Sequence, residues 1–193
     1  ANTIINNNVV ISDNVIVGNN CYIKSGAIIG EDGFGFELEK DGSLVRIPHI
    51  GNVVIGSNVE IGSNSIIVRG TLNSTIIESG VKIDDHVFIA HNCHVSNDTI
   101  IIACAEISGS VNIGKNCWIG PNSSIIQKIS IGDNSTIGIG ALITKDVEKN
   151  TFAITVKHIS SKQISQIKIP LAPIETQKQI VEELDGYQKI IDG

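Results

Sequence analysis

IESGVK IDDHVF IAHNCH VSNDTI IIACAE ISGSVN IGKNCW IGPNSS IIQKIS IGDNST IGIGAL ITKDV is the sequence of residues 77–147, written six residues to a group. Every group begins with isoleucine or valine, and the fifth residue of most groups is small or β-branched. The phase holds through twelve consecutive groups without a break. Chance does not produce such a run, so this hexapeptide repeat decides the fold.

A period of six residues is not a helical period, because a helix would spread these apolar residues around its circumference. Short β-branched runs between Gly, Asn, Asp and Ser are typical of strands and turns. A hexapeptide unit buries its apolar face only by stacking on its neighbours. The repeat therefore predicts an all-β fold, a parallel β-solenoid.

The same phase is already present in residues 5–34 and resumes at Ile55, with two interruptions. Residues 31–52 lose the period and contain Asp-Gly turn signals, which predicts a loop or hairpin inserted at one corner. The step from Ile67 to Ile77 is ten residues, so a small bulge is expected at 69–75. Such a bulge either re-aims side chains near a site or is a harmless corner insertion.

The repeat ends at Val147, and the remaining chain has a different character. We predict a β-helix domain over residues 1–148, a linker over 149–172 that includes a stiff IPLAP segment, and a helix over 173–193 that starts at a proline. Apolar residues spaced by four, three and four form a seam on this helix: Ile180, Leu184, Tyr187 and Ile191. A single short helix is marginal alone, so it is expected to pack in an oligomer.

Composition excludes several functional classes. The 193 residues have a net charge of −6, which opposes nucleic-acid binding by the solenoid. The chain contains no export signal and no apolar run long enough to span a membrane, so a cytoplasmic location is expected. The four cysteines lack CxxC spacing; three of them occupy the small fifth position of a hexad and are interpreted as reduced core residues: Cys21, Cys93 and Cys117.

Five segments together carry a family resemblance: NCYIKSG (20–26), GEDGFGF (30–36), RIPHIG (46–51), GVKID (80–84) and IAHN (89–92). They resemble the UDP-3-O-acylglucosamine N-acyltransferases of lipid A synthesis, within the hexapeptide-repeat acyltransferases. The resemblance covers about residues 5–145. It implies a triangular, left-handed parallel β-helix with three hexads per coil, an inserted loop, and a homotrimer whose active sites lie between subunits.

The resemblance also implies an activity. An acyl group passes from the phosphopantetheine thioester of acyl carrier protein to the amine of a nucleotide-linked glucosamine, with His91 as general base and the N–H of Gly109 as oxyanion donor. Elementary chemistry agrees, because an imidazole with a pKa of about 6.5 suits proton removal near neutral pH. If one coil is 18 residues, Gly109 lies directly above His91, where the absent side chain lets a thioester approach.

Other residues receive weaker assignments. Asp84 or Asp85 is expected to orient the imidazole, and further candidates for groove lining are His94, Gln127 and Lys128. Phe34 and Phe36 either cover the bound substrate or simply pack the loop onto the solenoid. Cys104 suggests a nucleophile, but this reaction needs no covalent step. No ligand cluster indicates a metal, and no tightly bound cofactor is expected.

Departures from the family leave other functions open. The family's N-terminal uridine-binding domain has no counterpart in this chain, its second histidine falls on Lys128, and its acid before Arg-Gly falls on Val68. An acetyl-coenzyme A-dependent acetyltransferase of nucleotide amino sugars is one alternative. The tail, around ISSKQI (159–164) and IPLAPIETQKQIV (169–181), resembles the conserved spacer of type I restriction–modification specificity subunits. A non-catalytic scaffold, including part of a DNA-modification complex, is therefore the other alternative.

Overall fold

The computed structural model describes residues 2–154 and five residues of the tail. The chain divides into two compact units, Ala1–Val156 and Lys157–Gly193. In the second unit the described residues have helical backbone: Ile174, Thr176, Lys178, Gln179 and Val181. The predicted linker at 149–172 and most of the predicted helix at 173–193 lie outside the described residues. Among the described residues, no helix has both the length and the apolar character needed to cross a bilayer.

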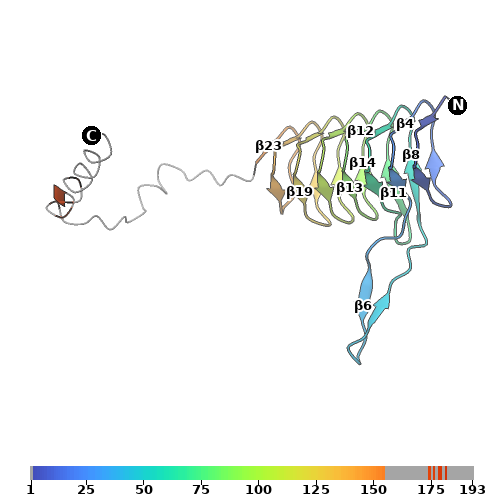
Figure 1. Ribbon diagram of the computed structural model, residues 1–193, viewed down its shortest axis with the longest axis horizontal. Helices are drawn as coiled ribbons and strands as arrows, with labels where there is room; N and C mark the ends of the chain where they lie inside the picture. Colours follow the sequence, from blue (N-terminus) through green and yellow to red (C-terminus); the bar gives the residue numbers. More distant parts are fainter. Residues whose placement is uncertain (1, 155–173, 175, 177, 180, 182–193) are drawn as a thin grey trace, which may run out of the picture. The chain divides into compact units, whose positions relative to one another are not determined.

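The first unit is a left-handed parallel β-helix, which confirms the predicted fold (Figure 1). Consecutive short strands turn from one sheet to the next, so three parallel sheets enclose one core. Sheet A contains β1 (Ile4–Ile5), β4 (Tyr22–Ile23), β9 (Glu60–Ile61), β12 (Lys82–Ile83), β15 (Ile100–Ile101), β18 (Trp118–Ile119), β21 (Thr136–Ile137) and β23 (Phe152–Ala153). Strand β23 lies beyond the expected domain end at residue 148.

The other two parallel sheets are built in the same way. Sheet B contains β2 (Val10–Ile11), β5 (Ile28–Ile29), β10 (Ile66–Ile67), β13 (Phe88–Ile89), β16 (Glu106–Ile107), β19 (Ser124–Ile125) and β22 (Leu142–Ile143). Sheet C contains β3 (Ile16–Val17), β8 (Asn52–Ile55), β11 (Ser74–Ile77), β14 (His94–Val95), β17 (Asn112–Ile113) and β20 (Ser130–Ile131). Every pairing within these sheets is parallel.

The register gives the length of a coil. Phe88 pairs with Glu106 and Glu106 with Ser124, steps of 18 residues or three hexads. Ile28 pairs with Ile66, a step of 38, because a hairpin of β6 (Phe36–Leu38) and β7 (Leu44–Arg46) is inserted between β5 and β8. Ile66 pairs with Phe88, a step of 22, because the bulge after β10 adds four residues. The hairpin and the bulge therefore account for the two longer steps of the register.

Most corners of the coil contain a left-handed residue, and many of these residues are asparagines. Positive φ recurs every six residues, from His86 (58°) and Asn92 (59°) through Asp98 (58°) and Cys104 (61°) to Ser110 (61°). Asparagine and glycine tolerate this conformation best among the common residues. The hexad therefore encodes both the inward strand residue and the turn that follows it.

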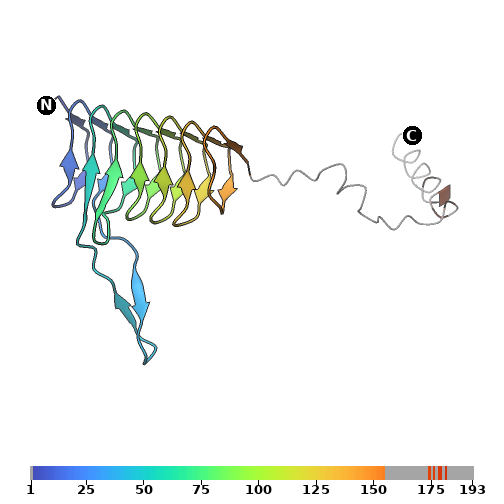
Figure 2. The same cartoon turned by 180° about the vertical axis from the view of Figure 1, so that it is seen from behind.

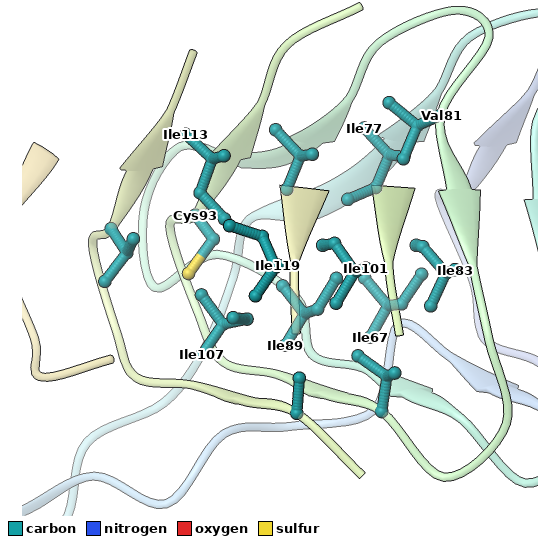
Figure 3. Packing of buried hydrophobic residues seen from close by; sticks show 14 of the residues in the cluster. Ile67, Ile77, Val81, Ile83, Ile89, Cys93, Ile101, Ile107, Ile113 and Ile119 are labelled. Atoms are coloured by element: carbon teal, nitrogen blue, oxygen red, sulfur yellow. The ribbon is translucent and has the colours of Figure 1, made fainter. Parts of the chain in front are cut away.

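From Ile23 onward, the first residues of the hexads pack into the core, and Figure 3 shows several of them. Twelve isoleucines are less than 2 % exposed: Ile23, Ile29, Ile55, Ile61, Ile67, Ile77, Ile83, Ile89, Ile101, Ile107, Ile113 and Ile119. Burial of one such side chain stabilises the fold by roughly 1.5–3 kcal/mol. The core is a column of stacked aliphatic rungs, which leaves the corners free to carry polar groups.

Candidate active site

The candidate site lies at one corner of the solenoid, the B–C corner, which we define as the turns that lead from sheet B to sheet C. The hairpin and the bulge both leave the coil here, after β5 and β10, and Figure 2 shows the hairpin projecting from the stack. A groove of about 240 Å³ runs beside them. Its lining comes from the hairpin, the bulge and three successive coils: Gly33, Phe34, Val68, Phe88, Ala90, His91, Glu106, Ser108, Gly109 and Gln127.

A second, more open hollow of about 550 Å³ lies at the last coils. It is lined by Ser130, Gly132, Asp133, Asp146, Val147, Glu148 and Lys149. This lining has neither an imidazole nor a thiol. The groove at the B–C corner is smaller, but an imidazole lines it, and histidine is the side chain that most often acts as a general acid or base, so we take the groove as the candidate site.

His91 and Gly109 are stacked one coil apart in the groove. The backbone N–H of Ser110 donates to the carbonyl oxygen of His91 at 2.8 Å, which fixes the two turns against each other. A Cβ atom built on Gly109 would be 2.6 Å from His91 Nε2, and real Cβ atoms do not approach that closely. The imidazole therefore lies over bare backbone, and a side chain at position 109 fits only if the imidazole or the turn shifts.

The amide of Gly109 is uncapped. At six turns of the other two corners, the amide two residues past the inward strand residue donates to a side chain of a neighbouring coil: Asn19 to Ser57, Ser57 to Ser79, Ser63 to Asp85, Asn97 to Glu78, Ala103 to Asp84 and Lys115 to Asp133. Gly109 N–H donates to none of the described residues. Ala90 occupies the place from which Asp84 caps Ala103, and a methyl group accepts no hydrogen bond.

The hairpin is anchored to the site through His49. Its side chain is 5 % exposed, and its ring lies 5.5 Å from the His91 ring, centroid to centroid, at 67°. His49 Nδ1 is 3.1 Å from the carbonyl oxygen of Ile47. A Cβ on Gly33 would be 2.5 Å from His49 Nε2, so the DGFGF segment needs a glycine there. The sequence analysis gave His49 no role, although the RIPHIG segment contains it.

Asn92 and Arg69 hold the bulge and the base of the hairpin. Asn92 Oδ1 accepts a hydrogen bond from the N–H of Thr71 at 2.6 Å, and the N–H of Asn92 donates to Thr75 Oγ1 at 2.9 Å. Arg69 donates to the carbonyl oxygen of Gly30 at 2.5 Å and to Asp13 Oδ1 at 2.6 Å. The guanidinium lowers the pKa of Asp13 through this hydrogen bond. These contacts fix the two insertions beside the groove.

The aspartates predicted to orient the imidazole bind elsewhere. Asp84 Oδ2 accepts from the N–H of Ala103 at 3.2 Å, and Asp85 Oδ1 accepts from the N–H of Ser63 at 2.6 Å. His91 Nδ1 is buried and has no hydrogen-bond partner among the described residues. Neither aspartate is therefore bonded to His91 Nδ1, because both carboxylates cap turns at a different corner.

The other predicted lining residues divide into two groups. Gln127 and Phe34 line the groove, whereas His94, Lys128 and Phe36 are not among its lining residues. His94 Nε2 lies 2.7 Å from Glu78 Oε1, with His94 on sheet C. Lys128 is an exposed turn residue with a φ of 64°.

Phe36 packs beside the groove rather than in it. Its ring lies edge-on against that of Phe34 at 4.9 Å, and the Arg46 guanidinium lies 5.6 Å from the Phe36 ring centroid. The sequence analysis missed the lining residues Glu106, Ser108, Phe88 and Ala90. Ala90 and Ser108 immediately precede His91 and Gly109, and Phe88 and Glu106 are outward residues of strands. Only the stacking of coils brings the four together.

The cysteines are free thiols, and the three predicted core cysteines are buried: Cys21, Cys93 and Cys117. Burial raises the pKa of the Cys93 thiol to about 11. Cys104 is exposed at the turn after β15, on sheet A, and does not line the groove. Among the described residues, no group of three or more His, Cys, Asp or Glu is arranged to hold a metal ion.

One family model matches most of the chain. It is described as the type I restriction modification DNA specificity domain, and it matches residues 60–192. The chain belongs to this family. Within this specificity-domain match, the described residues 60–154 are β-helix coils that supply all the groove-lining residues except Gly33 and Phe34. The rest of the match is the tail whose resemblance was noted in the sequence.

Curated relatives confirm the resemblance to the UDP-3-O-acylglucosamine N-acyltransferases. The chain is 60 % identical over 73 residues to the UDP-3-O-acylglucosamine N-acyltransferase of Chlorobium chlorochromatii, a match that covers 38 % of this chain and 20 % of that protein. It is 53 % identical over 75 residues to the enzyme of the same name from Coxiella burnetii, covering 39 % and 22 %. The chain thus spans about a fifth of the length of the curated relatives it matches.

Solved structures agree on the fold. The UDP-N-acetylglucosamine acyltransferase from Campylobacter jejuni superposes with a TM-score of 0.58 at 24 % identity, covering 75 % of this chain and 64 % of that one. The Arabidopsis UDP-N-acetylglucosamine acyltransferase superposes with a TM-score of 0.61 at 16 % identity, covering 97 % and 88 %. At these identities the likeness concerns the β-helix fold alone.

Proposed function

We propose that the chain is an N-acyltransferase that moves an acyl group from a phosphopantetheine thioester to the amine of a nucleotide-linked amino sugar. One observation carries this proposal. His91 lies over the side-chain-free backbone of Gly109, whose N–H donates to none of the described residues, and both line one groove. The identity to named N-acyltransferases over 73 residues supports the same chemistry.

The reaction needs a base and an oxyanion donor, and the groove offers both. His91 takes a proton from the attacking amine, whose nitrogen then forms a bond to the thioester carbon. Negative charge develops on the carbonyl oxygen, and the N–H of Gly109 donates to it. The carbon–sulfur bond breaks, the imidazolium returns its proton to the departing thiolate, and the products are an amide and a free thiol.

The co-substrate and the assembly are further parts of the proposal. Acyl carrier protein or coenzyme A presents the thioester, no tightly bound cofactor is needed, and a cytoplasmic homotrimer is the working assembly. The apolar groove wall, formed by Phe34, Val68, Phe88 and Ala90, suits an acyl chain. Acetyl-coenzyme A remains the alternative donor, because Lys128 replaces a histidine of the resembled family.

A scaffold role is the second candidate, and the family match over residues 60–192 favours it. In that case the β-helix and its tail would serve assembly of a DNA-modification complex. The net charge of −6 opposes direct DNA contact by this chain without a partner protein. A gel-shift titration with duplex DNA at two salt concentrations tests this role, and salt-sensitive retention of the DNA would favour it over catalysis.

The test of catalysis compares His91→Ala with His86→Ala. His86 is an exposed histidine at a turn after β12 and does not line the groove, so it is a matched control. Acyl transfer to UDP-glucosamine is measured with an acyl carrier protein thioester and with acetyl-coenzyme A. Loss of the base should lower the rate by roughly 10²–10⁴-fold. The control should keep wild-type turnover, and the wild-type donor preference then names the donor class.

Native mass spectrometry on the same proteins measures assembly. A trimer for wild type, His91→Ala and His86→Ala would show that the imidazole is not needed for folding. Wild-type turnover in folded His91→Ala, or no transfer with either donor, would overturn the proposed function.

A further inference from the structure

We propose that Glu106 binds the protonated amine of the acceptor and thereby selects amines over hydroxyl acceptors, an inference that rests on the proposed function. Glu106 lines the groove together with His91, Ser108 and Gly109. Apart from His91, Glu106 is the one ionisable side chain among the groove-lining residues. The groove therefore presents a negative group beside the base.

The position of Glu106 follows from the register. Glu106 is the outward residue of β16 and pairs with Phe88 of the preceding coil and Ser124 of the following coil. The next outward residue of the chain is Ser108, whose Oγ donates to Glu106 Oε1 at 3.0 Å. Gly109 follows directly, over the imidazole of His91. The carboxylate thus stands on the same coil as the uncapped amide.

Comparison with similar carboxylates shows that Glu106 is unusual. Six Asp or Glu residues of the described chain are partly buried, and five of them pair with a cation, an imidazole or a backbone N–H: Glu60 with Lys24, Glu78 with His94, Asp84 with Ala103, Asp85 with Ser63 and Asp133 with Lys115. Glu106 pairs with only a neutral hydroxyl among the described residues. A partly desolvated charge without a positive partner favours binding of a cation.

An amine acceptor supplies that cation. In its protonated form the amine carries three donors, and a carboxylate is their strongest partner in the groove. Binding in this form places the ammonium within the groove that also holds His91. The ammonium releases one proton to solvent before attack, and His91 then takes the second proton from the attacking amine and returns it to the departing thiolate. A hydroxyl acceptor carries no positive charge and gains less from the carboxylate. Glu106 is therefore a specificity-determining residue, whereas the proton transfer belongs to His91.

Two measurements on the full chain test this role. The variants are Glu106→Gln, which keeps the shape of the side chain, and Glu148→Gln, an exposed control that removes the same charge outside the groove. Isothermal titration compares the binding of UDP-glucosamine and UDP-glucose, and steady-state kinetics give kcat and KM for UDP-glucosamine. Glu106→Gln should weaken UDP-glucosamine binding roughly tenfold and leave UDP-glucose binding unchanged. KM should rise by a similar factor with little change in kcat.

Every other outcome overturns the inference. Equal weakening for both sugars would mean that Glu106 only shapes the groove. A fall in kcat with unchanged KM would mean that the carboxylate acts on His91 instead. Absence of UDP-glucosamine binding to the wild-type chain would also overturn it. Failure of the proposed function is distinguishable, because it appears as unaffected turnover in His91→Ala, whatever Glu106→Gln does.

Discussion

Two turns of the A–B corner and the Gly109 turn of the B–C corner differ in whether a side chain caps the backbone amide. At the A–B corner, where chains turn from sheet A to sheet B, Asp84 and Asp85 cap the amides of Ala103 and Ser63. At the B–C corner the corresponding amide of Gly109 is uncapped, and Ala90 stands where an acceptor would be. The hairpin and the bulge also leave the coil at the B–C corner only.

Under the proposed function, this difference separates residues that stabilise the fold from residues that bind substrate within one repeat. Both corners use the same hexad, the same left-handed turn residue and the same inward isoleucines. Two turns of the A–B corner use carboxylates to cap backbone amides, whereas the B–C corner has an imidazole, an uncapped amide and a carboxylate in one groove, which under the proposed function bind the substrates. Variants at the B–C corner, compared with controls at the A–B corner, therefore test whether the groove is the active site.

Gly109→Ala should have the largest effect among these variants. The new Cβ would lie 2.6 Å from His91 Nε2, so the imidazole must move or the turn must shift. We expect acyl transfer to fall by roughly 10²-fold or more, since both the base and the oxyanion donor lose their places. Ala103→Gly at the equivalent turn of the A–B corner is the matched control. Equal activity of Gly109→Ala and wild type would refute the close packing of base and backbone.

Asn92→Ala should have an intermediate effect. The change removes the acceptor of the Thr71 N–H and leaves that donor unpaired, which costs about 1–2 kcal/mol of the free energy of unfolding. Thermal unfolding and turnover are both measured, and both should fall because the bulge supports the groove. Asn122→Ala is the control, because its φ of 54° matches the 59° of Asn92. A similar loss in both variants would mean that only the turn conformation matters.

Asp13→Asn should have the smallest effect, and it should depend on pH. The Arg69 hydrogen bond holds the pKa of the Asp13 carboxyl below its usual value of 3.8 in the folded chain. A carboxyl whose pKa is lowered by folding stabilises the folded chain at pH values above its usual pKa. This stabilisation is lost as the pH falls through the folded-state pKa. The Tm difference between wild type and variant should therefore be seen at pH 7 and shrink as the pH falls below 3.8. A Tm difference that persists in acid would mean that the substitution acts through packing and not through the charge of Asp13.

The sequence predicted the groove only in part. It named His91 as base and Gly109 as oxyanion donor, roles that stay predictions, because the family resemblance and the 18-residue spacing of stacked positions pointed to the same pair. It missed His49, because the hairpin brings this side chain beside His91 from 42 positions away in the chain. It assigned Asp84 and Asp85 to the imidazole by nearness in sequence, whereas the turn between them and His91 directs both carboxylates to another corner.

By itself the sequence determined the solenoid, since a hexad encodes an inward residue and a left-handed turn, and these are local properties that repeat. It also determined where the two insertions break the repeat, because a change of phase is visible without coordinates. Only the tertiary structure decided which polar groups share a groove and which amides stay uncapped. The reason is that hydrogen-bond partners here come from neighbouring coils, so their identity depends on stacking across 18 residues or more rather than on local order.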